Sequence, residues 1–230
     1  MTDPSTALVH PVPAPEMHIG SYLGPSPLPE IDDRERAIAR THAVDGVVLY
    51  FDPNLPRDAP ITADNIIGSR RVDPDGHFTG QETRNSQFQP CAATARTTFT
   101  TAFEPTLWRV VHGYESLGAL VRGMAEATFH VPVAGKPGSP LHITAADGGY
   151  RTLAVYSSPD RIPALWPRWM VRQVPGRTIL EDFGSDITLV IDMNGGHFPG
   201  FRLPAYKLGA LWEENQQLNP EPAAAGAEKK

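Results

Sequence analysis

The sequence predicts an α+β fold, in which a mixed or antiparallel sheet is flanked by short helices and both ends of the chain are disordered. Apolar runs of strand length, such as Val47–Phe51 and Ile187–Ile191, alternate with segments whose apolar residues recur at helical spacing. Turn signals, among them the Asp-Pro-Asp-Gly run at 73–76, separate neighbouring strand-like runs and indicate hairpins. The two ends are rich in proline and polar residues, which offer little apolar surface for burial.

Four segments are expected along the chain. Residues 1–30 form a Pro-rich disordered arm, because repeated prolines fix φ and remove backbone donors. Residues 31–103 form an N-terminal α+β region, and residues 104–213 form a second α+β domain. Residues 214–230, which are mainly Gln, Pro, Ala, Glu and Lys, form a disordered tail. We expect the arm and the tail to be dispensable for folding.

The first region should contain one helix and three strands. A helix is expected over 31–44, because acidic residues at its start favour a helix N-terminus and Gly46 can end it. The apolar run Val47–Phe51 is typical of a buried strand. A second strand over 65–72 should turn at 73–76 and return as a hairpin through 77–79. The Thr-rich, polar stretch 81–101 is expected to be irregular.

The second domain should begin with helix and continue as short strands. Residues 104–127 have helical spacing, and Gly113 should divide them into two helices. Strands are then expected over 128–133 and 141–145. The second of these should form a hairpin with a strand over 151–156, through an Asp-Gly-Gly turn at 147–149.

The remaining elements alternate more clearly. Ser158 can cap a helix whose first residue is Pro159. The next expected elements are a strand over 170–174, a helix over 178–183 and the apolar strand Ile187–Ile191. After that strand, the pattern predicts an Asn-Gly-Gly turn at 194–196, a return strand over 198–203 and a last helix over 204–212.

Composition and charge exclude several classes of protein. The formal charge of −6 and the scarcity of Lys argue against nucleic acid as a partner, because phosphate binding needs a concentrated basic surface. Cys91 is the single cysteine, which excludes an intrachain disulfide and a thiolate zinc cage. No secretory signal peptide and no membrane-spanning run are apparent, and we expect a cytoplasmic protein.

The residue types that usually carry catalysis show no catalytic spacing. The eight histidines are scattered, and only His130 and His142 fall on neighbouring expected strands. Ser157 and Ser158 lie at a strand-to-helix turn, but the Gly-x-Ser-x-Gly pattern is absent and helix capping explains Ser158. Cys91 has no basic neighbour in sequence that would activate its thiol. We therefore expect no catalytic residue, no metal and no cofactor.

Aromatic residues are the remaining functional signal. Trp166 and Trp169 flank Pro167, while Phe198 and Phe201 flank a Pro-Gly pair. Such residues are most often buried, but partly exposed Trp and Phe also anchor protein interfaces. Trp166, Trp169, Phe198 and Phe201 are therefore the candidate partner-binding residues.

The layout of the second half resembles the SseB-like domain. The resemblance rests on the Ser-Ser-Pro helix start at 157–159 and on the Gly-rich turn that follows the apolar strand 187–191. Upstream, the Ile-Ile-Gly strand at 66–68, the turn at 73–76 and the Asn-Ser-Gln-Phe-Gln-Pro segment at 85–90 are similar to those of bacterial, mainly actinobacterial, type VII secretion system-associated proteins. Their second half is SseB-like. The resemblance implies an α+β fold without established catalytic residues.

Three functional hypotheses follow. The first is a non-enzymatic cytoplasmic accessory protein of type VII secretion that binds a protein partner, either a secretion component or a substrate. The second is a small-molecule enzyme or sensor whose cleft is lined by polar residues that no motif marks. The third is an immunity protein for a secreted toxin, which would also act by binding protein. A convergent group of buried polar residues would favour the second, whereas an exposed apolar patch would favour the first.

Overall fold

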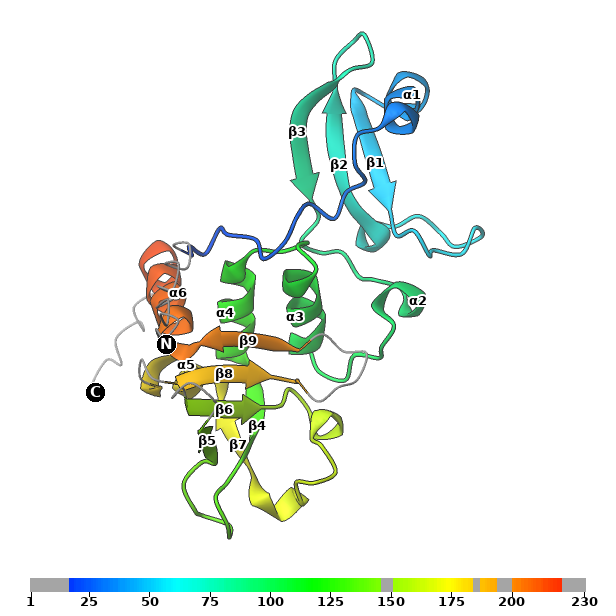
Figure 1. The fold of residues 1–230 in the computed structure, drawn as a ribbon. Helices are drawn as coiled ribbons and strands as arrows, with labels where there is room; N and C mark the ends of the chain where they lie inside the picture. The colour runs from blue at the N-terminus through cyan, green and yellow to red at the C-terminus, as the bar shows by residue number, and fades with distance from the viewer. Residues whose placement is uncertain (1–16, 146–150, 184–186, 194–199, 221–230) are drawn as a thin grey trace, which may run out of the picture.

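The computed structural model describes residues 17–145, 151–183, 187–193 and 200–220, and it has the expected α+β fold (Figure 1). Its α-helices are α1 (Asp33–His42), α2 (Ala92–Ala95), α3 (Phe103–Val111), α4 (Leu117–Glu126), α5 (Gly176–Asp182) and α6 (Ala205–Leu218). Its strands are β1 (Val47–Phe51), β2 (Ile66–Val72), β3 (Phe78–Arg84), β4 (Thr128–Pro132), β5 (Ile143–Ala145), β6 (Arg151–Val155), β7 (Val171–Pro175), β8 (Ile187–Ile191) and β9 (Phe201–Pro204). Three 3₁₀ turns complete the elements: η1 (Ala63–Asn65), η2 (Pro159–Arg161) and η3 (Arg168–Met170).

The first half is a three-stranded antiparallel sheet, in the order β1-β2-β3, with α1 packed beside it (Figure 1). α1 covers Asp33–His42 and is shorter than the expected 31–44; its acidic start is confirmed, because the Asp32 carboxylate accepts a bond from the Glu35 N–H at 2.8 Å. The expected hairpin between β2 and β3 is also confirmed. In its turn, the Asp73 carboxylate accepts bonds from the backbone N–H groups of Asp75 and His77.

The expectation of irregular backbone over 81–101 is partly wrong. β3 continues to Arg84, and α2 forms a single helical turn that ends at Arg96 in the left-handed region. β3 lies at the edge of the sheet and its side chains are mostly exposed, so polar residues are tolerated there. Because β3 is exposed along most of its length, its sequence shows no apolar alternation that hydrophobic periodicity could detect.

Gly113 separates α3 from α4, as the sequence predicts. Its φ is +76°, a left-handed conformation that glycine adopts without strain, and the Gly113 N–H bonds to the carbonyl of Val110 at 3.2 Å. The two helices then pack against each other with their apolar faces buried.

The second half contains two sheets. β5, β6, β8 and β9 form a mixed sheet, in which β6 and β8 are parallel and the outer pairs are antiparallel. β4 and β7 form a separate antiparallel pair, joined to β6 through a bridge between His130 and Tyr156. α4, α5 and α6 pack together and, with α3, complete the main core. The expected turns at 147–149 and 194–196 lie outside the described residues.

Three expected elements differ from the structure. The helix after Ser158 is only the 3₁₀ turn η2, and the Ser158 hydroxyl makes no capping bond. The hydroxyl is instead buried, because this turn packs into the protein. β9 is described only from Phe201 onward, and α6 extends six residues beyond Trp212, since Leu211, Trp212 and Asn215 share its buried face.

Two hydrophobic cores meet at α3. The larger core lies in the second half, while the smaller one lies between α1 and the β1-β2-β3 sheet. From α3, Leu107 and Val110 enter the larger core and Trp108 enters the smaller one. Phe99 packs against both. The boundary expected near residue 103 therefore falls at a helix that belongs to both cores.

The expected disordered arm is wrong for its second part. Residues 17–30 run along the body of the protein, from α6 past α4 to the β1-β2-β3 sheet (Figure 1). The carbonyls of Ile19 and Ser21 accept bonds from the first N–H groups of α4, at 2.7 and 2.9 Å. Leu28 is buried in the smaller core. The expected tail is likewise wrong for 214–218, which are helical; residues 1–16 and 221–230 lie outside the described residues.

Deletion of residues 1–29 should therefore destabilise the protein. It removes Leu28 from the smaller core and leaves the first N–H groups of α4 without their acceptors, a loss of about 2–5 kcal/mol for the leucine alone. Chemical denaturation of the two truncated proteins measures this effect. Deletion of residues 1–16 is the control, because it keeps all of these contacts. Equal stability of both truncations would show that the segment 17–29 contributes nothing.

Gly176, the first residue of α5, permits a close approach to the end of α4. A Cβ atom at this position would lie 1.7 Å from the carbonyl oxygen of Met124, which is fixed backbone. Gly176→Ala should therefore destabilise the protein by about 3 kcal/mol or more, although alanine normally favours a helix. Gly20→Ala is the matched control, because a Cβ atom added there would have nothing within 4 Å. A thermal melt in which both variants match the wild type would contradict the close approach.

Candidate protein-binding surface

The four predicted aromatic anchors do not form one surface. Trp169 is 58% exposed and Trp166 is half-buried. Phe201 is buried in the main core, where it pairs with Ile191 across β8 and β9, so its expected role as an interface anchor is wrong. Phe201 shares the inward face of β9 with Leu203, which its sequence neighbours do not reveal. Phe198 lies outside the described residues.

The loop between β6 and β7 carries the exposed aromatic. It is held by short-range bonds, from the Trp166 N–H to the Pro163 carbonyl at 2.9 Å and from the Met170 N–H to the Pro167 carbonyl at 2.8 Å. The Trp166 ring packs edge-on against His142, with 4.9 Å between ring centroids. Trp166 therefore positions the loop, and Trp169 is presented to solvent.

Leu165 joins Trp169 on this loop. It is 72% exposed, the highest value among the large exposed hydrophobic residues that the structure describes. Two large apolar side chains exposed four positions apart are a recognised feature of protein-binding surfaces. Leu165 was not among the predicted anchors, although its position between prolines and beside a tryptophan was a usable signal. We call Leu165 and Trp169, with the exposed Arg168 between them, the apolar loop surface.

A buried polar cluster lies at the start of the same loop. Glu104, on α3, is fully buried, and its carboxylate accepts bonds from the Ser157 hydroxyl at 2.9 Å and from the Arg161 guanidinium at 3.0 and 3.1 Å. The Thr100 N–H adds a fourth bond at 2.7 Å. Burial raises the pKa of Glu104, but the bonds from Arg161, Thr100 and Ser157 outweigh burial and hold this pKa below its usual value.

Asp192 completes the cluster from the end of β8. It is fully buried with φ +52°, and its Oδ1 accepts the Ser157 N–H at 2.8 Å. Burial raises the pKa of Asp192 to about 6, with a smaller contribution from the nearby Glu104 charge. The Asp192 Oδ2 and the Ser158 hydroxyl are both buried, and neither has a hydrogen-bond partner among the described residues.

The location of this cluster is typical of ligand sites, but its exposure is not. Ser157 and Asp192 follow the carboxyl ends of two neighbouring parallel strands, where α/β sheets commonly bind ligands. However, each of these side chains is at most 4% exposed. Neither Ser157 nor Asp192 lines any of the four cavities found among the described residues. The contacts described therefore support a structural role, which joins α3 and the loop to the mixed sheet.

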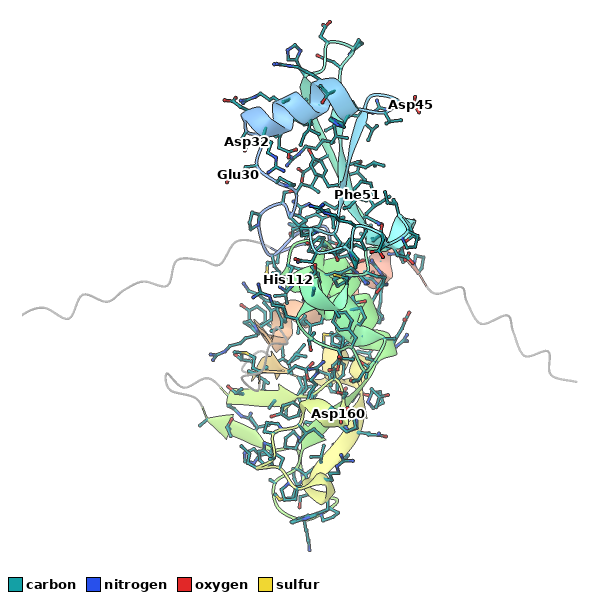
Figure 2. All side chains as sticks on the ribbon, turned by 90° about the vertical axis from the view of Figure 1, so that its right-hand side faces the viewer. Glu30, Asp32, Asp45, Phe51, His112 and Asp160 are labelled. Atoms are coloured by element: carbon teal, nitrogen blue, oxygen red, sulfur yellow. The ribbon has the colours of Figure 1, made fainter. Side chains whose placement is uncertain are left out.

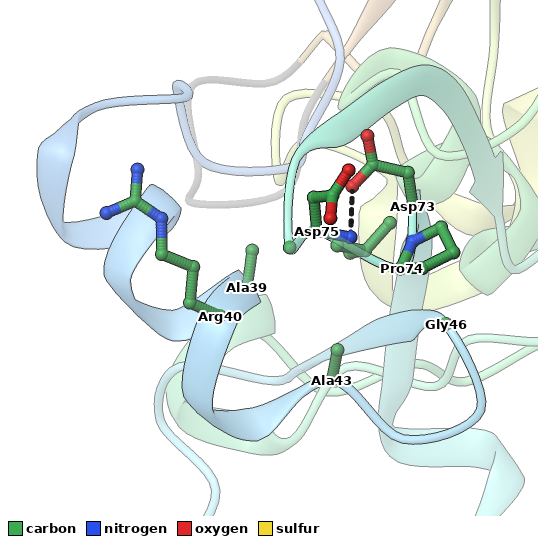
Figure 3. A pocket seen from close by; sticks show the side chains of 9 residues that line it. Ala39, Arg40, Ala43, Gly46, Asp73, Pro74 and Asp75 are labelled. Atoms are coloured by element: carbon green, nitrogen blue, oxygen red, sulfur yellow. Dashed lines mark hydrogen bonds between the residues drawn. The ribbon is translucent and has the colours of Figure 1, made fainter.

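One group of three possible metal ligands occurs among the described residues, in the β2-β3 turn: Asp73, Asp75 and His77. Figure 3 shows the two aspartates beside an open cavity of about 420 Å³, with Arg40 of α1 on the opposite side. The Asp73 Oδ1 already accepts two backbone N–H bonds from the turn. The turn explains this acidic group without a metal ion.

The other sequence candidates occupy structural positions. His130 exchanges two backbone bonds with Tyr156, and burial, helped by the charge of Arg168, lowers the pKa of His130. His142 supports Trp166, so the two histidines do not act as a pair. The Cys91 thiol donates to the Asn54 carbonyl at 3.5 Å in the loop before α2. No helix among the described residues is both long and apolar enough to cross a membrane.

The raised pKa of Asp192 predicts a pH dependence of stability. Between its ordinary pKa of 3.8 and about 6, the folded state binds more protons at this carboxyl than the unfolded state does. The free energy of unfolding therefore falls as the pH rises through this window. At higher pH, the free energy of unfolding stays at the lower value. Asp192→Asn removes this contribution, and asparagine tolerates the left-handed backbone. Relative to the variant, the wild type should lose about 1–3 kcal/mol between pH 4 and pH 7.

Denaturation of both proteins across this range measures the difference. Contributions from titratable groups that do not interact with Asp192 cancel in the comparison. Asp33→Asn is the control for the same substitution at a fully exposed carboxyl. Parallel profiles for wild type and Asp192→Asn would contradict the raised pKa.

Comparisons with known proteins identify no relative. No family model matches the chain, no curated protein is similar to it, and no solved structure matches its fold.

Proposed function

We propose that this protein is a non-enzymatic accessory protein that binds a protein partner through the apolar loop surface. The observation that carries the proposal is the exposure of Leu165 and Trp169 on a loop that is braced from within. Such side chains contribute most to binding energy when a partner covers them, and a braced loop loses little entropy on binding.

The charge beside these anchors points to the chemistry of the partner. Arg168 is exposed within the loop, and Arg172 is exposed on the strand that follows. The chain as a whole carries a charge of −6, so this short segment differs in sign from the rest. A partner segment that combines an apolar side chain with carboxylates would complement it.

The cellular context rests on the sequence resemblance alone. The likeness to SseB-like, type VII secretion system-associated proteins supports a partner that is a secretion component or a secreted substrate, bound in the cytoplasm. An immunity protein would use the same kind of surface. The identity of the captured protein distinguishes these roles.

A second candidate function, binding of a small polar ligand, is favoured by one observation. Asp192 Oδ2 and the Ser158 hydroxyl are buried without partners among the described residues, at the carboxyl ends of parallel strands. A metabolite that raises the melting temperature of the wild type, but not of Ser158→Ala, would support this function.

The test of the main proposal has two stages. The immobilised full chain is first used to capture proteins from a cell extract, and each captured protein is purified. Its dissociation constant is then measured for wild type, Trp169→Ala and Leu165→Ala. Each substitution should weaken binding by about 1–3 kcal/mol, roughly 5-fold to 150-fold, without lowering the melting temperature.

Tyr206→Ala is the matched control. Tyr206 is a half-exposed aromatic residue on α6, away from the apolar loop surface, so its removal should leave the affinity unchanged. If the purified partner binds Trp169→Ala and Leu165→Ala as tightly as the wild type, the apolar loop surface is not the binding site.

A further inference from the structure

A cavity of about 390 Å³ lies between α2 and the C-terminal end of α3, and we call it the α2-α3 cavity. α2 lies beside α3 in Figure 1, and Figure 2 shows His112 at the junction between the β1-β2-β3 sheet and the helices below it. The lining residues are Asn54, Thr94, Ala95, Arg96, Trp108, His112 and Tyr114. A cavity of this volume falls in the range of small-molecule sites, about 300–1,000 Å³.

A buried carboxylate holds the loop after β1 against α2. Asp52 is 3% exposed, and it accepts bonds from the backbone N–H groups of Asn54 at 2.9 Å and of Cys91 at 2.8 Å. The Thr94 hydroxyl donates to the same carboxylate. The side-chain amide of Asn54 in turn donates to the Thr94 hydroxyl at 3.0 Å. This side of the cavity is therefore preorganised, which lowers the entropy cost of binding a ligand.

Stacked rings form the side of the cavity that belongs to α3. The centroid of the Trp108 ring lies 4.1 Å from that of His112 and 5.4 Å from that of Tyr114. The His112 Nδ1 bonds to the Trp108 carbonyl at 2.8 Å. Because a carbonyl only accepts, Nδ1 carries the proton and Nε2 stays available to another partner. Burial, helped by the charge of Asp52, raises the pKa of Tyr114, so its hydroxyl stays neutral.

Arg96 supplies the charge of the cavity. It is the only arginine or lysine among the lining residues, and no aspartate or glutamate lines the cavity. Arg96 is exposed, and its guanidinium has no hydrogen bond or ion pair with any described residue. The chain as a whole carries a charge of −6. An unpaired arginine in a hollow without carboxylates is therefore a local point of attraction for an anion.

The backbone of Arg96 is also unusual. Its φ is +54°, in the left-handed region, where its N–H closes α2 through a bond to the Ala92 carbonyl at 2.9 Å. Glycine or asparagine usually occupies such a position, because other side chains strain it. The two other non-glycine residues with positive φ in the described part of the chain, Asp45 and Asp192, are of a type that tolerates it. Local stability does not explain an arginine here, and strain of this kind is typical of functional sites.

We propose that the α2-α3 cavity binds a small organic acid, whose carboxylate is held by the Arg96 guanidinium. The planar guanidinium presents two parallel N–H donors, which match the two oxygens of a carboxylate. The side-chain amide of Asn54, the Nε2 of His112 and the hydroxyl of Tyr114 are available to polar groups on the rest of the molecule.

The charges around the cavity favour a carboxylate over a phosphate. Arg96 is the single fixed cation, and it matches the single negative charge of a carboxylate. The ionised Asp52 lies directly behind Thr94 and opposes a second negative charge on the ligand. The site is independent of the apolar loop surface and of the buried cluster around Asp192, because it shares no residue with either.

Ligand-detected NMR on the full chain tests the proposal. The probes are carboxylates of up to about 20 non-hydrogen atoms, a size suited to a cavity of this volume. Each carboxylate is compared with its own neutral amide, and inorganic phosphate is included as a second anion. At least one carboxylate should bind with a dissociation constant of about 1 mM or below, and its amide should bind at least about tenfold more weakly.

Arg96→Gly separates binding from folding. Glycine adopts the left-handed backbone without strain, so the melting temperature of this variant should equal or exceed that of the wild type. Its affinity for the carboxylate should nevertheless fall at least about tenfold. Arg96→Lys keeps the charge but loses the paired donors, and its affinity should lie between the two. Lys136→Gly is the matched control, because it removes an exposed positive charge from the loop between β4 and β5, and it should bind like the wild type.

Four results would overturn the proposal. The first two are a wild type that binds no carboxylate of the panel and an amide that binds as tightly as its carboxylate. The third is unchanged affinity in Arg96→Gly. The fourth is a lower melting temperature of this variant, which would show that the arginine serves the fold. Tighter binding of phosphate than of every carboxylate would assign the cavity to phosphate compounds instead.

Discussion

The buried carboxylate of Glu104 joins the helix shared by both hydrophobic cores to the loop that carries the proposed binding surface. It lies on α3, which serves both hydrophobic cores, and it binds Ser157 and Arg161, which begin the loop after β6. Because Glu104 is fully buried, removal of its partners would leave an unpaired charge in the interior, at a cost of about 3–5 kcal/mol. The loop that presents Trp169 to solvent is thus fixed at its start by an ion pair and further along by the packing of Trp166.

The proposed binding surface presents side chains rather than backbone groups. Leu165 and Trp169 are exposed on a short loop with the exposed Arg168 between them, so the specificity of this surface would come from their shape and from the charge of that arginine.

Much of the fold could be predicted from local patterns. The apolar runs at Val47–Phe51 and Ile187–Ile191 are strands with those limits, and Gly113 divides two helices as expected, because these signals depend on near neighbours. The candidate site was less predictable. Of the predicted anchors, Trp169 is exposed and Phe201 is buried. The exposed Leu165 was not predicted as an anchor. The direction of Phe201 depends on the pairing of β9 with β8, which the sequence around Phe201 does not reveal.

Local sequence was enough to predict the fold class and the main strands and helices, and to show that recognisable catalytic motifs are absent, since each depends on composition or short-range spacing. Features that depend on distant residues emerged only when the chain was folded. Folding buried Leu28, which lies in a Pro-rich segment, in the smaller core. It also brought Glu104 and Asp192 to Ser157. A polar or Pro-rich segment becomes ordered only when residues elsewhere in the chain bury its apolar groups and bond its polar groups. The strand order, which places β1 at an edge of its sheet, also emerged only on folding, since it cannot be read from the pattern of a single strand.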